Sequence, residues 1–139
     1  MKIIGHLKGE VHKPMILASV TAEYPRLVRR RIEFMVDTGS DITAISKKDI
    51  LTMGISYNSL GNPVKNATGI GSKVQRWRVR NAILRFQGDD NKVKTYGPID
   101  IYILKTLEET PSLLGRDFIT KYNFKLVYDF PKKEIYLEK

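Results

Sequence analysis

The chain has 139 residues with 24 basic against 15 acidic side chains, and its formal net charge is +9. It contains no cysteine, which excludes disulfides, thiolate metal sites and cysteine nucleophiles, and it lacks the run of about 20 apolar residues that a membrane helix needs. We therefore expect one globular domain over residues 1–139, located in the cytoplasm and away from membranes.

The first predicted elements are two strands joined by a turn. Residues 15–20 and 28–36 place apolar side chains at alternating positions, which is typical of strands with one buried face. Residues 23–26 contain a proline and are predicted to form the turn between them. Further on, Ser46 is expected to cap a short helix over residues 47–51.

The middle of the chain predicts three more strands. Residues 75–79 alternate strictly, with Trp77 and Val79 on one face. The opposite face of this strand carries three arginines, Arg76, Arg78 and Arg80. Such a stripe is most simply a solvated strand face. Residues 93–96 and 99–104 are predicted to be two separate strands with a Gly-Pro pair between them.

The last predicted elements are a second helix and a hairpin. The helix is expected over residues 115–122, with Phe118 and Ile119 facing inward. Residues 123–128 and 134–137 flank a polar segment that contains a proline, which predicts a hairpin. Many short strands separated by turns indicate an all-β domain, closed or sandwich-like.

One short segment is a candidate for chemistry. Asp37, Thr38 and Gly39 follow directly on the apolar strand over residues 28–36, so a carboxylate should lie at the edge of a buried strand on a tight loop. Gly39 would let the backbone approach a ligand or another chain, and Thr38 could brace the loop. Because Asp, Thr and Gly are common turn residues, this segment by itself is most simply a plain strand-ending turn.

Four segments, in order along the chain, resemble the aspartic peptidases and, among them, the retropepsin-like single-lobe branch. Residues 36–40, Val-Asp-Thr-Gly-Ser, resemble the catalytic loop with its apolar lead-in. Residues 67–72, Ala-Thr-Gly-Ile-Gly-Ser, resemble the glycine-rich tip of the flap. Residues 112–117, Ser-Leu-Leu-Gly-Arg-Asp, resemble the strand beneath the catalytic loop and the start of the helix after it. The hairpin over residues 124–137 resembles the terminal strands of cellular relatives.

The resemblance implies a closed pepsin-like β-barrel with a flap hairpin and one or two short helices. It implies an aspartic endopeptidase that needs no metal or organic cofactor, with Asp37, Thr38 and Gly39 in the catalytic loop. The residues implied to bind substrate are Gly39, Asp41, Gly69, Ile70, Gly71 and Leu113. Arg116 is implied to be a structural support in a partly buried pair with Asp41.

The chemistry of this family needs two carboxylates that face each other across a water. Like charges so close cannot both ionise, so the pair shares one proton. This chain has a single Asp-Thr-Gly and no Asp-Ser-Gly, so the second carboxylate must come from another subunit, and a twofold axis between two copies of Asp37 would provide it. We therefore expect a homodimer that cleaves an extended polypeptide, with an acidic optimum. The strand over residues 134–137 is the better candidate for pairing between subunits.

Two functions from other classes stay open. The first is an inactive retropepsin-fold binding module that never assembles the carboxylate pair. The second is a basic nucleic-acid-binding β-barrel that uses the arginines at 29–31 and 76–80; it is possible but not favoured, because no recognisable nucleic-acid module accompanies the charge. Oligomeric state tests the first, and salt-dependent retention on nucleic acid tests the second.

Overall fold

The computed structural model describes residues 1–64 and 74–139. Over these ranges the strands are β1 (Lys2–Ile4), β2 (His6–Lys8), β3 (Lys13–Glu23), β4 (Arg26–Val36), β5 (Ala44–Ile45), β6 (Arg76–Gln87), β7 (Val93–Leu104), β8 (Ser112–Leu114), β9 (Lys125–Asp129) and β10 (Glu134–Glu138). The helices are α1 (Lys47–Thr52), α2 (Arg116–Lys121) and the 3-10 helix η1 (Tyr57–Leu60). None of these helices is long and apolar enough to cross a membrane.

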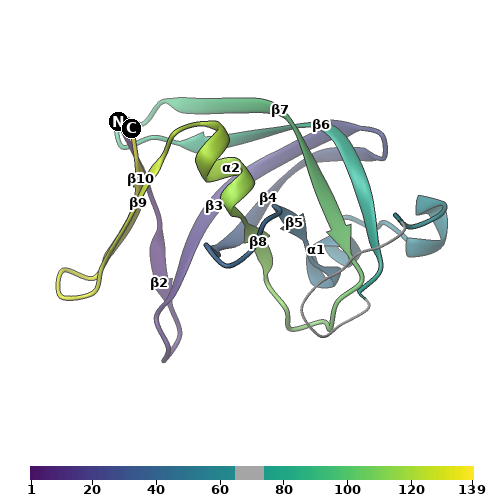
Figure 1. Cartoon of the computed structure of the whole chain (residues 1–139), viewed down its shortest axis with the longest axis horizontal. Coiled ribbons are helices and arrows are strands. Elements are labelled where there is room, and N and C mark those ends of the chain that lie inside the picture. Colours follow the sequence, from purple (N-terminus) through teal and green to yellow (C-terminus); the bar gives the residue numbers. More distant parts are fainter. Residues whose placement is uncertain (65–73) are drawn as a thin grey trace.

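Six strands close into a barrel in the order β3-β4-β8-β5-β7-β6, and pairing of β3 with β6 completes the ring (Figure 1). The β4–β8 and β5–β7 pairs are parallel and the other pairs of the ring are antiparallel. The short strand β2 extends the sheet beyond β3. The predicted closed, mostly β fold with two short α-helices is therefore confirmed.

The barrel interior is filled by the apolar positions of the alternating strands. Val20 of β3 and Phe34 of β4 are fully buried, and so are Val79 of β6 and Ile101 of β7. Burying a side chain of this size contributes roughly 1.5–3 kcal/mol each. The predicted strands over residues 15–20 and 28–36 are thus confirmed inside β3 and β4, and alternation correctly identified their buried faces.

Helix α2 covers one end of the barrel with an aromatic cluster. Phe118 is fully buried, as predicted, and its ring lies 5.3 Å from that of Phe86 and 5.0 Å from that of Tyr122. Phe124, which follows the helix, stacks on Phe118 at 5.7 Å. Ile119 is half-buried against the same core. These contacts fix the position of α2, which matters because its first residues touch the candidate site.

The structure corrects two details in the middle of the chain. Residues 93–104 form one continuous strand, β7, where two were predicted. Its partner β6 runs on to Gln87 with register shifts around Ala82. Gly97 has a φ of +143° and packs where a Cβ would lie 2.6 Å from the Ala82 carbonyl oxygen, so the Gly-Pro pair forms an irregularity within the strand and does not end it.

The predicted cap of α1 also differs. Ser46 precedes the helix, but its side chain makes no capping hydrogen bond. The residue is buried, and its hydroxyl accepts a hydrogen bond from Ser112 Oγ at 3.3 Å. Ser46 N also donates to Ser112 Oγ at 2.9 Å, so this serine connects the start of α1 to the neighbouring strand β8.

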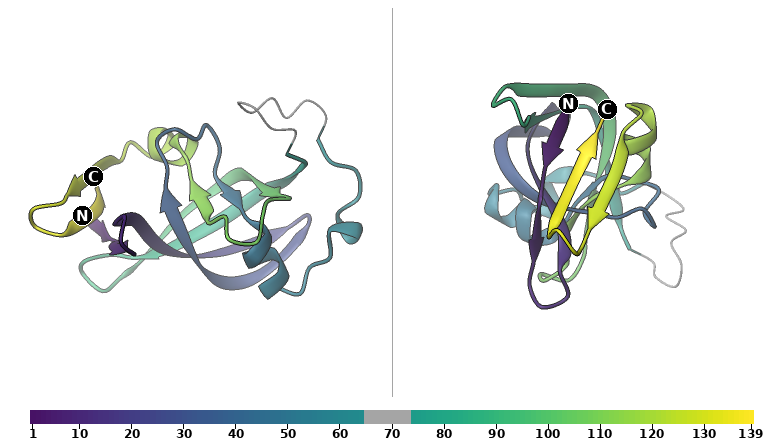
Figure 2. Two further views of the ribbon diagram at one scale, coloured as in Figure 1. Left: turned by 90° about the horizontal axis from the view of Figure 1, so that it is seen from below. Right: turned by 90° about the vertical axis from the view of Figure 1, so that its left-hand side faces the viewer.

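The two ends of the described chain meet in a second sheet of three strands, ordered β1-β10-β9 (Figure 2). The predicted hairpin is confirmed as β9 and β10. The expectation that residues 134–137 pair between subunits is wrong, because β10 is the middle strand and both of its edges are already paired within the chain. The pairing of β1 with β10 joins residues that are about as far apart as the sequence allows, so no local pattern could reveal it.

Candidate active site

The loop that follows β4, residues 37–43, is called the Asp37 loop below. The side chain of Val36 points into the core, so Asp37, one position later, projects to the opposite face. Asp37 is half-buried, whereas Thr38 and Gly39 are exposed. Gly39 N donates to Asp37 Oδ1 at 2.9 Å. This bond orients the carboxylate, and within the described residues Asp37 Oδ2 makes no hydrogen bond, so that oxygen is available for proton transfer.

Main-chain hydrogen bonds hold both ends of the Asp37 loop against β8 and α2. Asp37 N donates to the Leu114 carbonyl oxygen at 3.0 Å, which continues the parallel pairing of β4 with β8. Arg116 N donates to the Ser40 carbonyl oxygen at 2.9 Å. The segment over residues 112–117 therefore supports the Asp37 loop directly, in the place that the resemblance implied for it.

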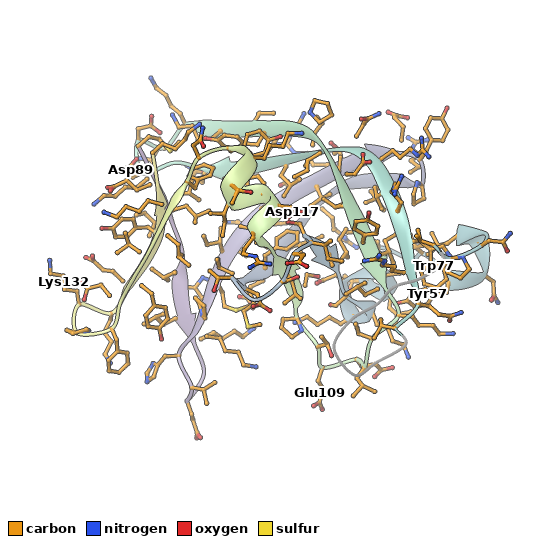
Figure 3. The ribbon with its side chains drawn as sticks, viewed as in Figure 1. Tyr57, Trp77, Asp89, Glu109, Asp117 and Lys132 are labelled. Atoms are coloured by element: carbon orange, nitrogen blue, oxygen red, sulfur yellow. The ribbon has the colours of Figure 1, made fainter. Side chains whose placement is uncertain are left out.

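A buried side-chain network adds to this support, and sequence reasoning assigned no role to its members. Asp117 Oδ2 accepts a hydrogen bond from Thr43 N at 3.0 Å, and Asp117 Oδ1 accepts one from Thr43 Oγ1 at 2.8 Å (Figure 3). Thr43 Oγ1 in turn accepts from Gly115 N at 3.1 Å. Thr43 is fully buried. The available signal was the Asp that directly follows Gly-Arg, but its partner lies 74 positions away.

Arg116 pairs with Asp41, as the resemblance implied. The expected burial of this pair is wrong for the single chain, since the two side chains are 54% and 79% exposed. Both lie on the outer side of the Asp37 loop, while the interior next to α2 is occupied by Phe118. Water therefore screens the attraction between Arg116 and Asp41 in the isolated subunit.

Substitutions of Asp117 and Arg116, which are neighbours on α2, are expected to change the stability by different amounts. We expect Asp117→Ala to lower the free energy of unfolding by about 1–3 kcal/mol, because it leaves buried Thr43 groups without an acceptor. Arg116→Ala should cost less than about 1 kcal/mol, since it removes an exposed ion pair. Urea denaturation of both variants, followed by circular dichroism, measures the difference. Asp117→Asn keeps one acceptor and should fall in between; equal losses for Asp117→Ala and Arg116→Ala would contradict this account.

Leu113 lies on the same side of the barrel wall as Asp37. It pairs in register with Met35 of β4, and alternation along both strands directs Leu113 and Met35 away from the core. Both are half-buried, whereas Ser112 and Leu114 beside Leu113 are fully buried. Leu113 and Met35 thus form an apolar surface next to the Asp37 carboxylate.

The predicted flap residues Gly69, Ile70 and Gly71 lie outside the described residues. The chain on either side of this segment is paired, because Val64 N donates to the Arg76 carbonyl oxygen at 2.7 Å. Residues 64 and 76 are therefore paired on either side of this segment.

Two aromatic side chains lie next to this pairing, and neither was singled out for that place from the sequence. Trp77 Nε1 donates to the Gly61 carbonyl oxygen at 3.1 Å, and the ring of Tyr57 lies 5.2 Å from that of Trp77 (Figure 3). The Tyr57 hydroxyl donates to the Leu104 carbonyl oxygen at 2.8 Å, and burial raises the pKa of Tyr57. Trp77 is buried, as strand alternation predicted.

The arginines of the chain lie in different surroundings. Arg78 and Arg80 are exposed on β6, while the Arg76 guanidinium lies over the Tyr102 ring at 5.0 Å. A hollow of about 250 Å³ on the outside of the barrel contains three other arginines among its lining residues, which are Ile4, Leu17, Ala18, Ser19, Arg29, Arg31, Arg85, Phe86, Gln87 and Val93. None of these lining residues is acidic.

Comparison with known proteins gives a family and a fold. Residues 27–121 match the model of a family described as "gag-polyprotein putative aspartyl protease". A retropepsin-like aspartic protease from Rickettsia conorii is similar in structure, with a TM-score of 0.59 and 21% identity over 99% of this chain and 90% of that chain. EIAV protease complexed with the inhibitor HBY-793 is similar with a TM-score of 0.51 and 14% identity over 87% of this chain and 98% of that chain. At these identities the two structures show a shared fold.

Proposed function

The chain belongs to the retropepsin-like aspartyl protease family, and on that premise we propose that it is an aspartic endopeptidase that works as a homodimer. The observation that carries the proposal is Asp37 itself. It lies at the end of a buried strand, is oriented by Gly39 N, and sits on a loop that β8 and α2 hold by main-chain hydrogen bonds. The sequence contains one Asp-Thr-Gly, so a complete pair of carboxylates requires a second copy.

The proposed reaction uses one proton shared between two copies of Asp37. The ionised carboxylate takes a proton from a water molecule, whose oxygen adds to the carbonyl carbon of the substrate. The protonated carboxylate, the partner's Asp37, donates to the carbonyl oxygen and so avoids a free oxyanion. The tetrahedral intermediate then collapses, the C–N bond breaks, and the leaving amine takes up a proton.

The proposed substrate is an extended polypeptide that lies across the two Asp37 loops. The exposed main chain of Gly39 is suited to hydrogen-bond such a strand. Leu113 and Met35 beside Asp37 favour apolar side chains next to the cleaved bond. We assign further substrate contacts to Asp41 and, from the resemblance, to Gly69, Ile70 and Gly71.

Digestion of a peptide library over a range of pH tests the function directly. The proposal requires cleavage that needs no added metal or cofactor, that is fastest at acidic pH, and that prefers apolar residues on either side of the broken bond. Mass spectrometry of the products identifies the cleaved bonds. No cleavage at any pH by a dimeric preparation would leave the chain as an inactive binding module.

We expect the specific activity to fall on dilution, because a site shared between two subunits is lost when they separate. The rate per mole of chain should drop over the same concentration range in which sedimentation shows dimer turning into monomer. A monomer that retains full specific activity would exclude the shared site, while leaving open a chain that cleaves peptides by another route.

A second candidate function, binding of nucleic acid, is favoured by the hollow with Arg29, Arg31 and Arg85 and no acidic lining residue. Binding to phosphates weakens steeply as salt rises, because counterions are released on association. Fluorescence anisotropy with a labelled oligonucleotide at several salt concentrations distinguishes this function from peptide cleavage.

A further inference from the structure

A hollow on the outside of the barrel, called the arginine hollow below, has the features of a ligand site. Its volume is about 250 Å³, and its charged lining residues are Arg29, Arg31 and Arg85. Pockets that enclose a drug-sized molecule measure about 300–1,000 Å³. The arginine hollow is smaller than that, so it suits a compact charged group with a short body and not a long stretch of polymer.

The arginines meet because their strands flank β3, which pairs with β4 on one side and with β6 on the other (Figure 1). Ser19 of β3 is the register partner of Arg31 on β4 and of Arg85 on β6. Side chains directly opposite each other across strands share a face, and Arg29, two positions before Arg31, shares it too. The backbones of β4 and β6 are about 10 Å apart here, twice the strand spacing, with Ser19 between them.

Most hydrogen-bond donors of these arginines are unused. Within residues 1–64 and 74–139 the guanidinium groups of Arg29 and Arg31 make no hydrogen bond or ion pair, and both residues are exposed. Arg85 is half-buried, and its Nη1 donates to Thr21 Oγ1 at 3.2 Å. An arginine carries five N–H donors, so this bond fixes the direction of Arg85 and leaves its other donors available.

The acidic side chains near the arginine hollow are bound to other groups. Those within three positions of a lining residue are Glu33, Asp89 and Asp90. Glu33 follows Arg31 by two positions on β4 and shares its face. Its two oxygens are bound separately, Oε2 by His6 Nε2 at 2.8 Å and Oε1 by Lys8 Nζ at 2.5 Å. Glu33 therefore pairs with these two neighbours and not with the arginines.

The two aspartates belong to the turn after β6. Asp89 Oδ1 accepts a hydrogen bond from Lys2 N at 3.1 Å, and Asp90 Oδ2 accepts one from Lys94 Nζ at 2.8 Å. The arginine hollow thus keeps an excess of positive charge. Like charges gathered across neighbouring strands destabilise a sheet, and a bound anion would remove that cost.

One side of the arginine hollow is apolar. Leu17 is half-buried there, whereas Ile4 and Val93 are 54% and 57% exposed. Charged groups and exposed aliphatic side chains in one small hollow favour a ligand that is itself part charged and part apolar. An inorganic ion would satisfy the arginines but leave these aliphatic side chains in water.

We propose that the arginine hollow binds a phosphate monoester whose organic part is apolar or aromatic. A phosphoryl group carries close to two negative charges at pH 7 and has three acceptor oxygens, so it matches several guanidinium groups at once. A carboxylate has one charge and two oxygens, which a single arginine satisfies in bidentate fashion. The phosphoryl group then sits between Arg31 and Arg85, and the organic part lies against Leu17. This chemistry occurs on small phosphate esters and on the phosphorylated end of a nucleic acid strand.

The arginine hollow is separate from the candidate active site. Arg31 precedes Asp37 by six positions, which corresponds to about 20 Å along an extended strand. A ligand in the hollow does not compete with a peptide at Asp37, and the inference does not depend on peptide cleavage. It rests on the second candidate function only in that both use the same arginines.

Calorimetric titration with phenyl phosphate tests the site. We expect Arg31→Gln and Arg85→Gln each to weaken binding about 10- to 100-fold, because each removes a hydrogen bond to a charged group. Arg31→Lys keeps the charge but not the planar fork of donors, so its affinity should fall between those of Arg31→Gln and wild type. Inorganic phosphate should bind more weakly than phenyl phosphate, since it makes no apolar contact with Leu17.

Arg78→Gln is the matched control, because Arg78 is an exposed arginine of β6 that does not line the hollow. It makes the same change in net charge and should leave the dissociation constant unchanged. Thermal denaturation without ligand separates binding from folding. Arg31→Gln should be at least as stable as wild type, since it relieves repulsion between like charges. Equal affinities of wild type, Arg31→Gln and Arg85→Gln, or an equal loss in Arg78→Gln, would overturn the site.

Two oligonucleotides of one sequence, with and without a terminal phosphate monoester, identify the source of the ligand. Tighter binding of the phosphorylated strand, lost in Arg31→Gln, assigns the site to the end of a nucleic acid strand. Binding of phenyl phosphate with no preference between the two strands assigns it to a small phosphate ester. If both strands bind equally, Arg31→Gln weakens both and phenyl phosphate does not bind, the arginines hold backbone phosphates. The second candidate function then stands and the monoester site fails, as it also does if none of these phosphates binds.

Discussion

Replacing Asp37 with Asn should abolish peptide cleavage while the barrel stays folded. The amide has the shape of the carboxylate but neither accepts the proton of the attacking water nor shares a proton with the partner's Asp37. Loss of general acid–base catalysis alone costs roughly 10²- to 10⁴-fold in rate, and here one substitution alters both halves of the pair. Initial rates on a peptide identified by the library digest measure the effect.

The loop itself should survive the change, because Asn keeps the Oδ1 that accepts a hydrogen bond from Gly39 N. A matched control is Asp100→Asn. Asp100 is an exposed carboxylate on β7 whose Oδ1 likewise accepts a backbone hydrogen bond, from Asn81 N at 3.1 Å. That variant should cleave at the wild-type rate. Wild-type cleavage by rigorously purified Asp37→Asn would exclude Asp37 as the catalytic group.

The second large effect is expected from Gly115→Ala, which touches no substrate. Gly115 is buried where β8 passes under the Asp37 loop. A Cβ there would lie 2.6 Å from the Ile42 carbonyl carbon and 3.0 Å from the Ser40 carbonyl oxygen, with the Ile42 oxygen closer still. These are backbone atoms of the loop, so the loop must move away from β8. Overpacking of this kind costs about 1–3 kcal/mol of stability.

Activity should suffer more than stability in Gly115→Ala. A displacement of about 1 Å at a catalytic group can cost roughly 10²-fold in rate, and this displacement acts on the loop that carries Asp37. Thermal denaturation and cleavage rates, measured on the same preparation, separate the two effects. Gly9→Ala is the control, because Gly9 has a φ of +75° but open space around it. It should lose about 1 kcal/mol through its backbone conformation and keep its activity.

The sequence predicted the strands that have one buried face. Residues 15–20 and 28–36 lie within β3 and β4, and the hairpin over residues 123–137 covers β9 and all of β10 except its last residue. Alternation is a local signal, so it identifies such strands without knowledge of their partners. The same signal stops at a bulge, which is why β6 was predicted too short and β7 was divided at Gly97.

The sequence identified those parts of the candidate site that are formed by residues adjacent in the chain. Asp37, Thr38 and Gly39 form one motif, and Arg116 was assigned to Asp41 by resemblance. The bonds from Asp117 to Thr43 were not found, because they depend on how α2 is placed against the Asp37 loop. Burial of the Arg116 pair was wrong for a related reason, since sequence shows which charges can meet but not how much water surrounds them.

Trp77 gives the protein a built-in optical probe. It is the chain's single tryptophan, it is buried, and its indole N–H donates to the Gly61 carbonyl oxygen. Intrinsic tryptophan emission therefore comes from this one position, 5.2 Å from the ring of Tyr57, which can transfer excitation to it. A change in emission on adding a peptide would report on the surroundings of Trp77 in the unlabelled protein, and with Asp37→Asn the signal can be followed without the proposed cleavage.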